Sequence, residues 1–204
     1  MASVADRKIT SEIFAYPTDT VWGVGGSIFS CDIISKISTI KGVDRGKPHS
    51  ILFDSSIAVE QFFSLPAQLS SELLDRLFCL ESTVGIPLEW AREIIPYEIT
   101  AGSSWVAVRA LSIAPVKDVI LRANGPVITT SLNRTGEPPI SNLDGAKKFI
   151  ATCQTPITLV DDGQDYCSGH SSTIILLGRE GGHQVVRGGR YAEKIIHFLE
   201  EVSF

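Results

Sequence analysis

The sequence predicts an α/β (α+β) fold in which an open, twisted, mixed sheet is flanked by helices. Short apolar runs typical of strands alternate with segments of helical periodicity in the first half of the chain, whereas strands gather late. The chain of 204 residues is 44% hydrophobic and 20% charged, which allows a sizeable buried core. It contains no internal repeat, low-complexity tract or linker, so we expect a single domain over residues 1–204.

The strand predictions rest on short runs of apolar residues, many of them β-branched or aromatic. In chain order they cover residues 13–16, 50–53, 82–86, 105–109, 127–131, 157–160, 173–177 and 184–187. Pro17 fixes φ and cannot donate to a sheet ladder, so the first strand should end there.

The helix predictions rest on apolar residues at helical spacing. Ile33, Ile37 and Ile40 recur in this way within residues 32–41. A proline near the start and Gly125 just beyond the end bracket a helix over residues 115–122. Similar patterns predict helices over residues 70–79, 143–152 and 192–202.

Charge and composition exclude several classes of protein. A net charge of −5 argues against a broad nucleic-acid-binding face. The N-terminal residues 1–10 lack the apolar core of a secretory signal, and no run approaches the ~18 apolar residues of a membrane span. The four cysteines form no C-x-x-C pair and should be reduced and mostly buried, as in a cytoplasmic protein. The scattered histidines offer no zinc spacing, so we expect no dedicated metal site.

Residues 16–25, YPTDTVWGVG, form the most informative segment of the chain. The segment leaves an apolar run and passes into hydroxyls, one carboxylate and glycines, which let the backbone approach a ligand or another segment closely. From composition alone, a polar turn before a helix is about equally good an interpretation.

Three further segments carry candidate binding groups. Residues 42–48 form a cationic loop after a helix, although they do not match a phosphate-binding Walker A sequence, and from composition alone a solvated charged turn is the better interpretation. Residues 129–136 place hydroxyls and an amide at a strand end, where open α/β sheets bind ligands, although a cap or turn fits equally well. Arg109 ends an apolar strand and should have an anionic partner, which is either an Asp or Glu of the protein or a ligand.

Together these motifs resemble the YrdC/Sua5 family of threonylcarbamoyl-adenylate synthases. The family pattern P-T-[DE]-T-V-[YW]-G-[LV]-G is met at residues 17–25, and its later motifs follow in order over about residues 11–190. These later matches are Lys41 with Lys47-Pro48, Val108-Arg109, Ser131-Leu132-Asn133, Ser172-Thr173-Ile174 and Arg187-Gly188-Gly189. The resemblance implies a YrdC-like domain with a concave central cleft.

The resemblance also implies an activity. Members of the family condense L-threonine, bicarbonate and ATP into threonylcarbamoyl-adenylate and release pyrophosphate, with Mg2+ carried by ATP. The product passes to a tRNA threonylcarbamoyl transferase complex that acts on adenosine 37. Such a nucleotidyltransferase would be cytoplasmic, and no membrane partner is expected. Because catalysis would be positioning and charge neutralisation, the chain needs no nucleophilic triad.

Matching each motif to the family implies the site residues. Lys41, Ser131 and Asn133 would form the catalytic cluster. The same three residues, with Lys47 and Arg187, would bind ATP. Thr20, Arg109 and Ser172 would bind threonine, with Arg109 pairing with its carboxylate.

The chain also departs from the family. The arginine of the family's K-x-R motif is Val43 here, which removes one phosphate-binding cation, and Arg45 or Arg134 would have to replace it. Of the family segment W-P-G-P-x-T, residues 78–83 keep only Thr83. An alternative function is therefore a catalytically weakened paralogue that binds a nucleotide or makes weak contact with RNA.

Overall fold

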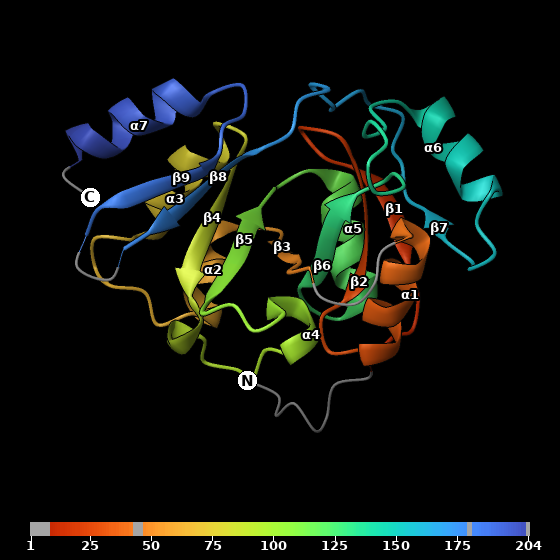
Figure 1. The fold of residues 1–204 in the computed structure, drawn as a ribbon, viewed down its shortest axis with the longest axis horizontal. Helices are drawn as coiled ribbons and strands as arrows, with labels where there is room; N and C mark the ends of the chain where they lie inside the picture. Colours follow the sequence, from red (N-terminus) through yellow and green to blue (C-terminus); the bar gives the residue numbers. More distant parts are fainter. Residues whose placement is uncertain (1–8, 43–46, 179–180, 203–204) are drawn as a thin grey trace.

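The computed structural model describes residues 9–42, 47–178 and 181–202. Its strands are β1 (Phe14–Pro17), β2 (Trp22–Ser27), β3 (Ser50–Phe53), β4 (Ser82–Pro87), β5 (Trp105–Ala110), β6 (Val127–Ser131), β7 (Thr158–Leu159), β8 (Thr173–Leu177) and β9 (His183–Arg187). Its helices are α1 (Cys31–Lys41), α2 (Ser56–Phe62), α3 (Ser71–Phe78), the short 3-10 helix η2 (Leu88–Trp90), α4 (Tyr97–Thr100), α5 (Ala114–Ala123), α6 (Leu143–Ala151) and α7 (Ala192–Glu201). Figure 1 follows these elements along the chain.

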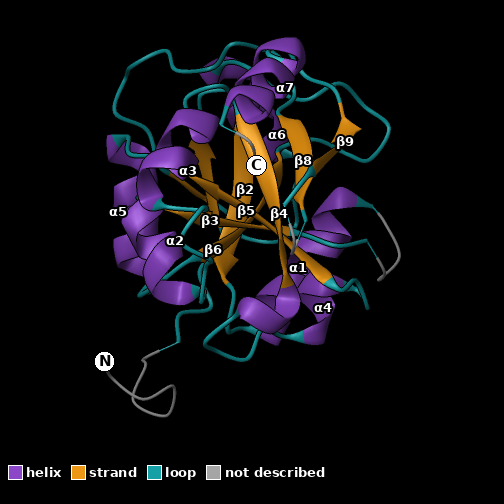
Figure 2. Cartoon of the chain, turned by 90° about the vertical axis from the view of Figure 1, so that its left-hand side faces the viewer, coloured by secondary structure: helices purple, strands orange, loops and turns teal. Residues whose placement is uncertain are grey.

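The strands form one nine-stranded mixed sheet in the order β7-β1-β2-β6-β3-β5-β4-β8-β9. Strands β1/β7, β3/β5 and β4/β8 pair in parallel, and the other neighbours are antiparallel. The sheet runs through the middle of the molecule with helices around it (Figure 2). The predicted α/β fold with a mixed sheet is therefore confirmed.

Strand β2 is the main difference from the predicted elements. The glycines after Trp22 were interpreted as part of a polar turn, but residues 22–27 form a fully buried strand between β1 and β6. The glycines are needed for close packing rather than for turning. A Cβ on Gly25 would lie 1.9 Å from the carbonyl oxygen of Ile128, and one on Gly26 would lie 2.8 Å from that of Glu12. The segment therefore admits no side chain at these positions, although glycine is usually unfavourable in strands.

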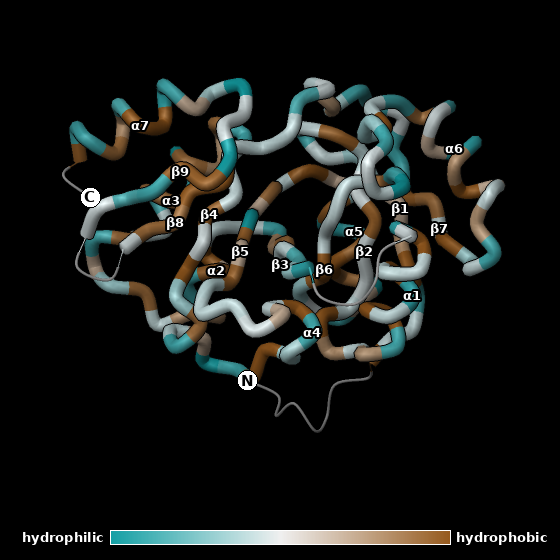
Figure 3. Tube along the Cα trace, in the orientation of Figure 1, coloured by the Kyte–Doolittle hydropathy of each residue, from teal (hydrophilic) through white to brown (hydrophobic). Residues whose placement is uncertain are grey.

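Apolar side chains gather in two clusters. The smaller one packs α5 residues Val116 and Val119 against Phe14, Leu52 and Val127 of the sheet. The larger one contains the apolar faces of α1, α2, α3 and α7 together with side chains from strands β1 to β6 and β8. In Figure 3, α7 alternates between hydrophobic and hydrophilic segments, as expected for a helix that buries one face. The five predicted helices agree with α1, α3, α5, α6 and α7 to within one or two residues at each end.

Helices α2 and α4 had no predicted counterpart, because seven and four residues are too few to show a helical period. The prediction of mostly buried cysteines is wrong. Cys31 and Cys79 are exposed, and Cys153 and Cys167 are half-buried. Each exposed cysteine sits at a helix end, where the chain reaches the surface.

The segment between β7 and β8 crosses the upper edge of the molecule and joins its two halves (Figure 1). It is fixed to the loop after β1, because Ser168 N donates to Asp19 O at 3.0 Å and Gly169 N donates to Thr20 O at 2.8 Å. These contacts hold residues 18–20 beside the start of β8.

Candidate active site

A cavity of about 240 Å³ is lined by residues of β2, β3, β4, β5, β6, β8 and β9 and of the loop after β1. Its walls come from the loop after β1, the starts of β2 and β3, the ends of β5, β6 and β9, and the start of β8. The lining includes Thr18, Thr20, His49, Leu52, Thr83, Arg109, Thr129, Thr130, Ser131, Ser171, Ser172 and Arg187. The cavity thus combines two guanidinium groups with many hydroxyls, a composition that suits an anionic, hydrogen-bonding ligand.

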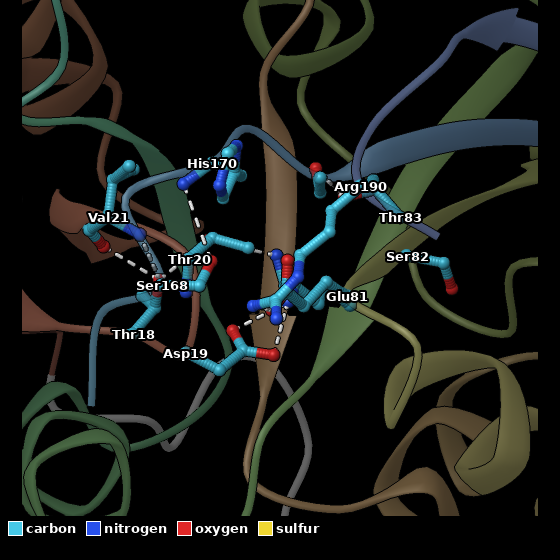
Figure 4. A network of polar contacts seen from close by, with 12 residues as sticks. Thr18, Asp19, Thr20, Val21, Glu81, Ser82, Thr83, Ser168, His170 and Arg190 are labelled. Atoms are coloured by element: carbon cyan, nitrogen blue, oxygen red, sulfur yellow. Dashed lines mark hydrogen bonds and ion pairs between the residues drawn. The ribbon is translucent and has the colours of Figure 1, made fainter. Parts of the chain in front are cut away.

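The loop after β1 is a tight hydroxyl-rich turn. Thr18 Oγ1 donates to the carbonyl oxygen of Val21 at 2.7 Å and lies 2.9 Å from Thr20 Oγ1. Both threonines are buried. Figure 4 shows Thr18, Asp19 and Thr20 together on one side of this network, with Thr83 on the other. The turn therefore presents ordered hydroxyls to the cavity.

Arg109 reaches this turn from β5. Its Nη2 lies 2.5 Å and 2.6 Å from the two carboxylate oxygens of Asp19, and its Nη1 donates to Thr20 Oγ1 at 3.3 Å. The anionic partner predicted for Arg109 is thus an aspartate of the chain itself in this structure. Its Nε is buried and has no hydrogen-bond partner among the described residues. Because an unsatisfied buried donor is costly, an acceptor brought beside this N–H would be stabilised.

The opposite wall holds Ser172 and Arg187. The Ser172 hydroxyl lies 2.9 Å from Thr83 Oγ1, and Arg187 donates from Nε and Nη2 to the Ser172 carbonyl oxygen at 3.0 Å and 2.9 Å. Burial, and then the positive charge of Arg109, lower the pKa of Arg187. Two cations that repel each other across a cavity favour an anion between them.

Lys41, at the end of α1, forms a second cluster with the end of β6. Its Nζ donates to the carbonyl oxygen of Ser131 at 2.6 Å, to Asn133 Oδ1 at 2.5 Å and to Ser131 Oγ at 3.3 Å. Asn133 is fixed in turn by donation from Nδ2 to Glu137 O at 2.6 Å. Burial, together with the charge of Lys47, lowers the pKa of Lys41 to about 8. The three residues predicted as a catalytic cluster are therefore in contact.

Not every predicted residue lines the same cavity. Five of the predicted residues line the main cavity: Thr20, Arg109, Ser131, Ser172 and Arg187. Lys41 and Asn133 do not line it, but both form hydrogen bonds with Ser131, which does. Lys47 instead lines a neighbouring cavity of about 300 Å³ between α1 and α4.

Arg45 and Arg134 were the two candidates to replace the missing family arginine. Arg45 lies outside the described residues, as does Val43 itself. Arg134 is engaged elsewhere, because its Nη1 donates to Ile40 O at 2.6 Å and its guanidinium lies 5.6 Å from the ring centre of Phe149.

Sequence reasoning missed three residues of the site. Asp19 was noted in its motif but not assigned to Arg109. Thr83 carried a signal, because it is the residue retained from the family's W-P-G-P-x-T segment. His49 gave none, since it stands alone before β3. Among the described residues, no group of three or more His, Cys, Asp or Glu could hold a metal ion.

The mixed sheet and its cationic, hydroxyl-lined cavity define an α/β protein with a site suited to an anionic ligand. Residues 10–189 match the family model Sua5_yciO_yrdC, described as "Telomere recombination". The chain therefore belongs to the Sua5/YciO/YrdC family.

Curated relatives include the threonylcarbamoyl-AMP synthases of Hydrogenovibrio crunogenus and Pseudoalteromonas atlantica. The first is 30% identical over 152 residues, covering 71% of this chain and 78% of the relative. The second is 26% identical over 146 residues, covering 70% of this chain and 76% of the relative.

Solved structures agree on the fold. P. abyssi Sua5 complexed with L-threonine superposes with a TM-score of 0.77 at 23% identity, covering 92% of this chain and 53% of that one. This chain thus spans about half the length of the P. abyssi protein. E. coli YciO superposes with a TM-score of 0.68 at 17% identity, covering 88% and 84% of the two chains.

Proposed function

We propose that the chain is an L-threonylcarbamoyladenylate synthase, which condenses L-threonine, bicarbonate and ATP and releases pyrophosphate. The observation that carries the proposal is the single cavity shared by Arg109, Arg187 and Ser131, with Lys41 in contact with Ser131. Its cations match a substrate set made of a carboxylate, bicarbonate and a triphosphate. Two curated relatives bear the name threonylcarbamoyl-AMP synthase, which supports the same activity.

In this proposal the threonine-binding end lies at Thr20, Arg109 and Ser172. The guanidinium of Arg109 and the hydroxyl of Thr20 would meet the substrate carboxylate, and Asp19 would have to share the guanidinium with it. Ser172 and its partner Thr83 offer hydroxyls for the amino group or side chain of the amino acid.

The nucleotide-binding end would lie at Lys41, Lys47, Ser131, Asn133 and Arg187. Transfer of the adenylyl group needs the carbamate oxygen in line with the α-phosphorus and needs charge neutralisation on the leaving pyrophosphate. The Arg187 guanidinium in the cavity wall and the Lys41 ammonium behind Ser131 would supply that charge, while Mg2+ would arrive with ATP. No step requires a protein nucleophile.

A pyrophosphate-release assay tests this function, with ATP, threonine and bicarbonate left out in turn. We expect release only when all three are present with Mg2+. Pyrophosphate formation that is indifferent to threonine would contradict the substrate assignment.

One observation favours a second candidate. Val43 stands where the family has a cation. A chain that binds ATP or RNA but releases no pyrophosphate would be the weakened paralogue. Steep loss of RNA binding with salt would identify RNA as its ligand.

We further infer that residues 1–204 act as one domain in the cytoplasm and hand their product to a tRNA threonylcarbamoyl transferase complex. None of the helices in the described part of the chain has the length and apolar character needed to cross a membrane.

A further inference from the structure

His49 stands in the wall between two cavities. It lines the main cavity with Arg109 and Ser131, and it also lines the neighbouring cavity with Lys47 and Tyr97. Its backbone is fixed, because His49 N donates to Ile99 O at 2.8 Å. The next residue, Ser50, pairs with Thr129 of β6. One further step along this antiparallel register brings His49 opposite Thr130, next to Ser131.

The imidazole of His49 is suited to accept a proton. Within the described part of the chain, no hydrogen bond or ion pair engages its ring. Burial, and then the positive charge of Lys41, lower the pKa of His49, so the ring is neutral at pH 7 and keeps a free lone pair. The other titratable groups around these two cavities are Lys41, Lys47, Tyr97, Glu98, Arg109 and Arg187.

Three of those neighbours act as hydrogen-bond donors. Arg109 donates to Asp19, Arg187 donates to the carbonyl oxygen of Ser172, and the Lys41 ammonium donates to Ser131 and Asn133. Of the described residues that line the main cavity, His49 alone offers a side-chain nitrogen that is a neutral base at pH 7.

The reaction in the proposed function requires such a group. The amino acid enters as an ammonium ion, and an ammonium nitrogen has no lone pair with which to attack bicarbonate. We propose that His49 is the general base that deprotonates the α-ammonium of the amino-acid substrate, so that carbamate formation precedes adenylyl transfer. This inference rests on the proposed function and assigns one residue within it.

The step balances in atoms and charge. His49 takes one proton from the ammonium, and the freed amine attacks the bicarbonate carbon. The C–N bond forms while the C–OH bond breaks, and the hydroxyl leaves as water with a second amine proton. Carbamate and protonated His49 remain, and the ring then releases its proton to solvent. Nothing is oxidised or reduced. His49 lies between the Arg109 and Lys41 ends of the site, where the carbamate must form.

The test compares wild type with His49→Gln, and with His197→Gln as the matched control. His197 lies on the exposed face of α7, paired with Glu201 at 3.1 Å. Pyrophosphate release is measured from pH 5.5 to 9.5 with all substrates saturating. We expect His49→Gln to lower kcat at pH 7 by roughly 10²–10⁴-fold, the usual contribution of a general base. The acid limb of the wild-type profile should disappear, and the deficit should shrink toward pH 9.5, where solvent supplies the free amine.

A second measurement separates catalysis from structure. ATP formation from threonylcarbamoyl-adenylate and pyrophosphate reports adenylyl transfer without carbamate formation, so His49→Gln should change it less than about threefold if His49 acts only as this base. Unchanged forward rate and pH profile in His49→Gln would overturn the inference alone, and so would an equal loss in both directions. A wild-type protein without threonine-dependent pyrophosphate release would overturn the proposed function and the role of His49 with it.

Discussion

Replacing Arg109 with alanine tests the threonine-binding end of the site. In this structure the change removes two short contacts to Asp19, and the Arg109 and Asp19 side chains are 7% and 25% exposed. Because Asp19 keeps some access to water, we expect a loss near the lower end of the range for breaking a buried pair, about 2–3 kcal/mol in the free energy of unfolding. For a chain of this length that corresponds to a fall in Tm of roughly 4–12 °C.

Substrate binding should respond more selectively than stability. If Arg109 pairs with the threonine carboxylate, Arg109→Ala costs about 2–4 kcal/mol in threonine binding, or roughly 30–1000-fold in Kd. ATP affinity should change by less than about threefold, since Ser131 and Lys41 remain in place. Calorimetry with each ligand below the lowered Tm separates the two effects.

Two further variants sharpen the result. Arg122→Ala removes an arginine–carboxylate pair of similar length at the surface, with Glu12 at 2.8 Å, and should cost less than about 1 kcal/mol. Asp19→Asn removes the anion that competes for Arg109, so threonine should bind at least as tightly as to wild type. Equal losses for threonine and ATP in Arg109→Ala, or a lower Tm with unchanged threonine binding, would refute the carboxylate-binding role.

Three other predictions concern the nucleotide end and the sheet. Burial and the charge of Lys47 lower the pKa of Lys41 from 10.5 to about 8, so ATP affinity should fall as pH rises above 8 and Lys41 loses its charge. The free energy of unfolding should rise over the same range, because the cost of burying the Lys41 charge is present below pH 8 and relieved above it. Lys41→Met should abolish the first trend in calorimetry and the second in denaturant titrations. Val43→Arg should tighten ATP binding by roughly 1–2 kcal/mol, and an unchanged Kd would place the phosphates away from this loop. Gly25→Ala should destabilise the fold by more than about 4 kcal/mol, because its Cβ would meet Ile128 O at 1.9 Å, whereas Gly188→Ala, with Ala192 Cβ at 3.8 Å, should cost less than about 1 kcal/mol in the same denaturation assay.

Most of the fold could be predicted from the sequence because most of its helices and strands have a recognisable local pattern of apolar and polar residues. Strands such as β3, β6 and β8 match their predicted bounds, since each is a short apolar run with polar neighbours. Strand β2 could not be found in this way. Its glycines are typical of turns, and only the positions of Tyr16, Ile128 and Ile33 around them explain why a strand needs them.

Motif order pointed to residues several of which line one cavity, but it could not give their partners. Arg109 and Asp19 lie 90 residues apart in the chain, and only the pairing of β5 with β3 and β4, together with the loop after β1, brings them together. His49 could not be distinguished from any other histidine beside a strand. Its place between two cavities follows from α4, an element of four residues that no periodicity reveals.

Three of the cations assigned to a substrate are engaged with acceptors of the chain itself. Arg109 donates to Asp19, Arg187 donates to the carbonyl oxygen of Ser172, and Lys41 donates to Ser131 and Asn133. These acceptors differ in charge, and therefore in how strongly they compete with an incoming anion for the cation. Asp19 carries a full charge and competes with a carboxylate, whereas the carbonyl and amide groups are neutral and leave the charge of Arg187 and Lys41 uncompensated. The nucleotide end of the site therefore attracts anions more strongly than the amino-acid end before either substrate binds. We expect ATP to bind the free protein with a steeper salt dependence than threonine, and equal salt slopes in calorimetry would show that the two ends carry similar uncompensated charge.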